Sequence, residues 1–78
     1  MPRYFFDIRD DDTTIDSEGM EFADTHAAIA FAYKAAREIA AETAVAGRLV
    51  TGHRIEIADA DHRLIDTVTF GEAVGLDL

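Results

Sequence analysis

Residues 3–9 read Arg3-Tyr4-Phe5-Phe6-Asp7-Ile8-Arg9, and three aspartates follow them at positions 10–12. An alternating aromatic segment that ends at a cluster of aspartates is typical of a strand that runs into a solvated turn. Successive side chains of a strand point to opposite sides, so Tyr4, Phe6 and Ile8 share one side. We expect these three residues to enter the core and the alternate residues to stay outside it.

The length and composition indicate one globular domain that spans residues 1–78. Of its 78 residues, 49% are hydrophobic and 29% are charged, which is typical of a folded chain. The chain has no cysteine, which excludes disulfides and thiolate catalysis and fits a reducing compartment. We see neither a secretory signal nor an apolar run near the roughly 20 residues of a membrane span. A cytoplasmic location is therefore expected.

The charge is strongly negative, with 16 acidic residues, seven basic residues and a net charge of −9 at pH 7. Nucleic-acid binding depends on Lys and Arg that neutralise phosphates, so this balance argues against it. It argues equally against binding to an anionic membrane surface. A basic protein or a cation would be attracted, although such a charge also simply keeps a small protein soluble.

The centre of the chain predicts a ragged second strand and then a long helix. Residues 15–22 carry the strand, and Gly19 within it indicates a bulge or a bend. Asp24 is suited to cap the start of the helix, and Gly47 is suited to end it. The predicted inward stripe consists of Ala28, Ala32, Ala35, Ile39, Thr43 and Ala46, widened by Ile29, Phe31 and Ala36.

The remaining sequence predicts a hairpin, with strands at Arg54–Ala58 and at 63–70 around a polar turn. In the last strand Leu64, Val68 and Phe70 share one side, and Asp66 interrupts it. Either Asp66 lies at the margin of the sheet, or the register shifts. The predicted fold is α+β: a four-stranded antiparallel sheet of β-β-α-β-β connectivity and strand order 2-1-3-4, with one helix on one face.

This fold leaves the other sheet face bare. The residues that we expect there, as a candidate contact surface, are Phe5, Asp7, Arg9, Arg54 and Glu56. The two edge strands are alternative contact sites through strand addition. A protein-interaction module that binds a protein partner or a second copy of itself is the function that these features favour.

The acidic turn, residues 10–21, raises a second possibility. Its acids Asp10, Asp12, Asp16, Glu18 and Glu21 fall at positions 1, 3, 7, 9 and 12 of a calcium-loop count. Ile15 replaces the glycine that such a loop requires, and a strand enters it instead of a helix. Divalent-cation binding is thus an alternative to a solvated acidic turn.

No motif of catalysis stands out. The three histidines lie in different segments without the spacing of a zinc site. Ser17 is the only serine, and neither a GxSxG motif nor a glycine-rich phosphate loop is present. We expect no enzymatic activity and no cofactor.

The segments 2–10, 35–38, 52–57 and 67–70 together resemble a family of short bacterial proteins of unknown function that open with R-Y-F-F. The resemblance covers nearly the whole chain and implies a free-standing small domain. It implies no activity, cofactor or catalytic residue. The chain departs from the usual pattern of the family at Asp66, where an apolar residue is common.

A weaker resemblance lies in Phe22-Ala23-Asp24-Thr25, which leads from an acidic hairpin into an alanine-rich helix. This arrangement is similar to small antitoxin domains that mask mRNA-cleaving toxins. It implies, as an alternative function, a dimeric acidic domain that covers a basic toxin.

Overall fold

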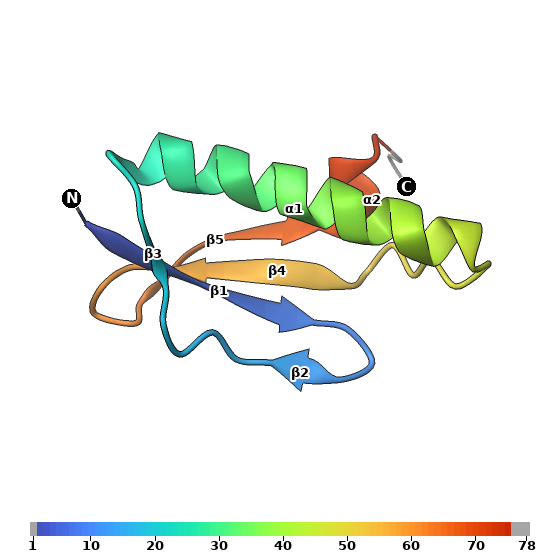
Figure 1. The fold of residues 1–78 in the computed structure, drawn as a ribbon, viewed down its shortest axis with the longest axis horizontal. Coiled ribbons are helices and arrows are strands. Elements are labelled where there is room, and N and C mark those ends of the chain that lie inside the picture. The colour runs from blue at the N-terminus through green and yellow to red at the C-terminus, as the bar shows by residue number, and fades with distance from the viewer. Residues whose placement is uncertain (1, 76–78) are drawn as a thin grey trace.

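The chain forms an antiparallel sheet with a long helix along one side (Figure 1). The structure is a computed structural model that describes residues 2–75. Its elements, in chain order, are β1 (Arg3–Arg9), β2 (Thr13–Thr14), β3 (Met20–Glu21), α1 (Thr25–Val45), β4 (Arg54–Ala58), β5 (Leu64–Thr69) and α2 (Phe70–Ala73). The predicted α+β class is confirmed. Neither helix in the described part of the chain is both long and apolar enough to cross a membrane.

The strand order is β2-β1-β4-β5, and β3 also pairs with β1. The order differs from the predicted one only because the predicted second strand is broken into β2 and β3, which gives five strands instead of four. β2 pairs with the end of β1 at Ile8 and Arg9, whereas β3 pairs with its start at Arg3 and Tyr4. The chain between β2 and β3 leaves the ladder.

Asp16 bridges this break with both its side chain and its backbone N–H. The Phe6 N–H donates to Asp16 Oδ2 over 3.1 Å, and the Asp16 N–H donates to Asp7 Oδ1 over 2.9 Å. Gly19 brings the chain back with a φ of 71°. A Cβ at this position would lie 2.8 Å from the Tyr4 carbonyl oxygen, so only glycine fits there without a shift.

Helix α1 begins and ends where the sequence predicts. Asp24 caps it, with Oδ1 accepting from the Ala27 N–H at 2.8 Å. Ala46 is the last cap residue, and Gly47 follows in the left-handed region with a φ of 73°.

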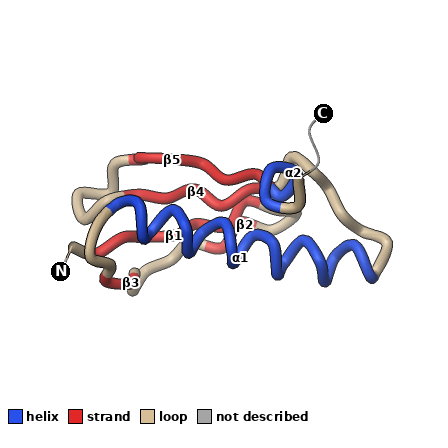
Figure 2. Tube along the Cα trace, turned by 90° about the horizontal axis from the view of Figure 1, so that it is seen from above, coloured by secondary structure: helices blue, strands red, loops and turns tan. Residues whose placement is uncertain are grey.

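The buried side of α1 differs from the predicted stripe. Its fully buried residues recur at every fourth position and are Ala28, Ala32, Ala36 and Ala40. Ala35, Ile39 and Thr43 flank this row and are half-buried, whereas Ala46 is exposed. Figures 1 and 2 both show the C-terminal end of α1 running past the ends of the strands, and Ala46 is the cap residue at that end.

The core lies between the alanine row and the sheet. Its larger buried members are Tyr4, Ile55, Ile57, Val68 and Phe70. Phe6 and Ile8 pack against them, which confirms that Tyr4, Phe6 and Ile8 face the helix. The Phe6 ring lies 5.2 Å from Phe31 and 5.8 Å from Phe22, and these aromatic contacts close the core beside β1.

The end of the described chain corrects two predictions. The last strand covers only Leu64–Thr69, because Phe70 opens α2. Thr69 and Glu72 form a capping box that starts this short helix, and Phe70 remains in the core at 1% exposure. The predicted turn or frayed tail over 71–78 is in part this helix, and residues 76–78 lie outside the described residues.

A bulge also changes the facing of the last strand. Ile57 pairs with Asp66 but Ala58 pairs with Leu64, so Ile65 is an additional residue. Leu64 therefore turns away from the helix, contrary to the prediction. Asp66 stays on the helix side and is exposed, because β5 is an edge strand with solvent beside it. The first alternative for Asp66, a place at the sheet margin, is the one observed.

Candidate protein-interaction face

The side of the sheet opposite α1, here called the open face, gathers all five predicted contact residues. Strand register arranges its residues in three rows, because directly paired residues of antiparallel strands share a face. The apolar row is Phe5, Ala58 and Leu64; the acidic row is Asp7, Glu56 and Thr67; the basic row is Arg9, Arg54 and Thr69. Both described helices lie off this face (Figures 1 and 2).

The apolar row is partly covered by a histidine from the hairpin tip. The His62 ring stacks on Phe5, with 4.5 Å between the ring centroids and 32° between the planes. His62 holds a φ of 61°, and the tip is fixed by Asp59 Oδ1, which accepts from the Arg63 N–H at 3.0 Å. Leu64 remains 61% exposed. The row thus presents an aromatic stack and a free aliphatic side chain.

The two charged rows neutralise each other. Glu56 accepts from Arg9 Nε at 2.7 Å and from Arg54 Nε at 3.2 Å, and Arg9 lies 3.9 Å from an Asp7 oxygen. The hydrogen bond from Arg9 lowers the pKa of Glu56; the one from Arg54 adds to this, and partial burial opposes both. Arg3 and Glu21 pair at 3.3 Å at the far end of β1. Three arginines thus balance three carboxylates on this face.

The sheet edges, by contrast, are protected. On β5 the Thr67 N–H donates to Asp66 Oδ1 over 2.7 Å, so this donor is taken. On the opposite edge, where the ladder is broken, the Asp16 side chain accepts a hydrogen bond from the Phe6 N–H. Charged residues and bulges on edge strands are devices that prevent pairing with another chain.

A family model described as a domain of unknown function (DUF6894) matches residues 3–71. The chain belongs to this family. The matched region runs from the start of β1 into α2 and includes every residue of the open face. The resemblance to a family of unknown function is thereby confirmed. Neither a curated protein nor a solved structure matches the chain.

Within the matched region, the predicted cation ligands do not come together. Asp10 Oδ1 accepts from the Asp12 N–H, Glu21 pairs with Arg3, and Glu18 is exposed. The Asp16 carboxylate already accepts hydrogen bonds from backbone N–H groups at the β2–β3 break. Among residues 2–75 no three acidic or histidine side chains are grouped in a way that could hold a metal ion.

Asp16 is, with Glu56, an acid whose pKa the structure lowers. Its partial burial alone would raise the pKa of its carboxyl. The N–H groups of Gly19, Phe6 and Glu18 all donate to this carboxylate, and together they lower its pKa below the ordinary value. The carboxylate therefore has a structural role in the β2–β3 break.

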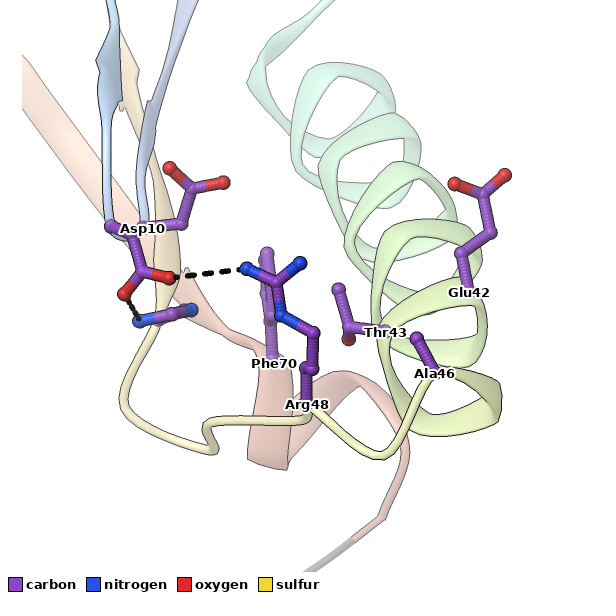
Figure 3. Close-up of a pocket in the computed structure, with 8 residues that line it drawn as sticks. Asp10, Glu42, Thr43, Ala46, Arg48 and Phe70 are labelled. Carbon is purple, nitrogen blue, oxygen red and sulfur yellow. Dashed lines mark ion pairs between the residues drawn. The ribbon is translucent and has the colours of Figure 1, made fainter.

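A second cluster, which the sequence does not indicate, lies at the C-terminal end of α1 (Figure 3). A hollow of about 200 Å³ opens there between the turn after β1 and the end of the helix. Asp11 pairs with Arg48 at 3.7 Å and with His53 Nε2 at 3.5 Å, and the His53 ring meets Phe70 edge-on. These residues are far apart in the chain, so no spacing could reveal them. The contacts of Asp11 with Arg48 and His53 tie the turn to the segment that follows α1.

Proposed function

We propose that this protein is a protein-interaction domain and that its partner docks on the open face. The observation that carries this proposal is the apolar row on the uncovered side of the sheet. Leu64 stays 61% exposed in the same row as the Phe5–His62 stack, because the bulge in the β4–β5 pairing turns it away from the helix side. Apolar side chains gathered on one face mark sites of protein contact.

The protected edges favour docking on the face over strand addition. On β5 the Asp66 side chain accepts a hydrogen bond from the Thr67 N–H. At the other edge the Asp16 side chain accepts one from the Phe6 N–H, where the strand is broken. The neutral charge of the face supports a partner that is bound by shape and apolar contact. It does not favour a basic toxin, which an acidic surface would suit better. We propose a binding role without catalysis, and we place it in the cytoplasm because the chain lacks cysteine.

Two matched variants test this proposal. Leu64 and Ile15 are 61% and 60% exposed, but Leu64 lies on the open face and Ile15 lies in the β2–β3 break at the sheet edge. We expect Leu64→Asp to lose a partner captured from the native host, and Ile15→Asp to retain it. Both variants should unfold at nearly the native temperature, because each side chain is exposed.

The captured protein is then purified and titrated against the native chain and both variants by calorimetry. Equal affinity of Leu64→Asp and the native chain would rule out the open face as the docking surface. Loss of binding in Ile15→Asp alone would move the contact to the sheet edge.

A further inference from the structure

We infer that the partner on the open face is a second copy of this chain, packed face to face about a two-fold axis. This inference rests on the proposed function and specifies its partner. The closed symmetry of a two-fold dimer requires a surface that is complementary to itself. The row pattern of the open face meets this requirement.

The distribution of charge favours a second copy as the partner. The chain carries −9, yet Arg3, Arg9 and Arg54 on the open face balance Asp7, Glu21 and Glu56. Two acidic copies can therefore meet here without bringing a net charge of the same sign into contact. A basic partner would be drawn to the acidic remainder of the surface instead.

The order of the rows determines the direction of the two-fold axis. The acidic and basic rows are adjacent, about 7 Å apart along the strands at two residues of rise. A two-fold axis that crosses the strands between these rows places the acidic row of each copy over the basic row of the other. Asp7 then faces the partner's Arg9, and Glu56 faces the partner's Arg54. An axis parallel to the strands would place like charges together, so the rows select the crossing axis.

The thin core also favours association. Four of the nine core residues are alanines, and small domains with a modest core often gain stability by association. A second sheet at the usual spacing of about 10 Å would shield the charged rows as in a sheet sandwich, and the axis would place the apolar rows of the two copies at opposite ends of the interface. The helices of both copies would lie on the outside.

Charge reversal tests the proposed pairing directly. The native chain is measured by light scattering over a concentration series and is expected to form a dimer. Arg54→Glu and Glu56→Arg each place like charges opposite each other, and each should weaken dimerisation by about tenfold or more. An equimolar mixture of the two variants restores opposite charges across the interface, and it should regain the dimer mass.

The double variant Arg54→Glu/Glu56→Arg is the control for folding. It keeps an ion pair within each chain and opposite charges between chains, so it should dimerise like the native protein. Thermal unfolding of all four proteins identifies any loss that comes from the monomer itself.

The outcomes separate this inference from the proposed function. If the native chain is monomeric at every concentration, the inference that the partner is a second copy is overturned. The capture experiment with Leu64→Asp then decides whether the face binds another protein. A dimer that neither single variant weakens uses another surface, which also overturns the inference. A mixture that stays monomeric while each single variant is weakened overturns the crossing arrangement.

Discussion

At the scale of single residues, Asp16 replaces a stretch of strand. Where β2 and β3 leave the ladder, its two carboxylate oxygens accept from three backbone N–H groups, those of Phe6, Glu18 and Gly19. Hydrogen bonds to a charged acceptor are stronger than those between neutral groups. This acid therefore allows the second strand to break without leaving the Phe6 N–H of β1 without a hydrogen-bond acceptor.

Asp16→Asn should destabilise the fold by about 1–3 kcal/mol at pH 7. Asparagine has one acceptor oxygen, so its NH₂ group would face either the Phe6 N–H or the N–H groups of Glu18 and Gly19. The folded pKa of Asp16 is lowered, so its contribution is complete above the ordinary carboxyl range. It is lost as the pH falls through the folded pKa. Urea denaturation at pH 7 and along an acid series measures both effects.

The control for this prediction is Asp12→Asn, which removes the same charge from an exposed position in the acidic turn. It should change the free energy of unfolding by no more than about 0.5 kcal/mol. If the difference in free energy of unfolding between Asp16→Asn and the native chain grew towards low pH, this would contradict the role assigned to the carboxylate.

Gly19 and Gly47 separate backbone strain from close packing. Their φ values are 71° and 73°, but a Cβ at Gly47 meets nothing within 4 Å, whereas one at Gly19 reaches the Tyr4 carbonyl oxygen. Gly47→Ala should cost about 1 kcal/mol from the left-handed backbone alone. Gly19→Ala should cost about 1–3 kcal/mol more, because β1 must move. Equal losses of stability for the two variants in thermal unfolding would show instead that the β2–β3 break shifts to accommodate the added Cβ without further cost.

At the scale of elements, the alanine row sets the distance between α1 and the sheet. Ala36 is fully buried and Ala30 is exposed on the same helix. Ala36→Leu should destabilise the protein by about 1–3 kcal/mol, because the added atoms must displace the helix. Ala30→Leu should be nearly neutral. Denaturant titrations of the two variants compare them, and a neutral Ala36→Leu would mean that the helix sits loosely on the sheet.

The sequence predicts those elements whose signals are local. Asp24 and Gly47 mark the ends of α1, and the alternation of Tyr4, Phe6 and Ile8 fixes the facing of β1. The end of β5 is different, because Phe70 fits an alternating strand as well as it fits the core position that it takes from α2. The Thr69–Glu72 capping box, a weak signal in the sequence, decides whether Phe70 continues the strand or begins a helix.

The same distinction holds for the site. Alternation alone places Phe5, Asp7 and Arg9 on the open face. Leu64 joins them only because of the bulge, and His62 joins them only through the left-handed backbone of the hairpin tip. Bulges and hairpin tips depend on how two strands meet in space, so a single strand pattern cannot reveal them.

At the scale of the whole molecule, paired and excess charges occupy different parts of the surface. The open face is neutral, so the excess of nine negative charges lies elsewhere. Exposed pairs such as Arg3–Glu21 and Arg48–Asp11 contribute little, on the order of 0–1 kcal/mol each. The radius of gyration is 12.3 Å, so most of the excess charges lie within a few Debye lengths of one another at about 10 Å in 0.1 M salt.

Added salt should therefore raise the thermal midpoint by a few degrees at pH 7, because it screens the repulsion among excess carboxylates more than it weakens the exposed pairs. Calorimetry in sodium chloride and in potassium chloride, at a protein concentration at which light scattering shows the monomer, measures this shift without a mass-action contribution from association. Near the isoelectric point of about 4.4 the excess charge vanishes, and the shift should vanish with it. A midpoint that falls with salt at pH 7 would show instead that the paired charges outweigh the excess.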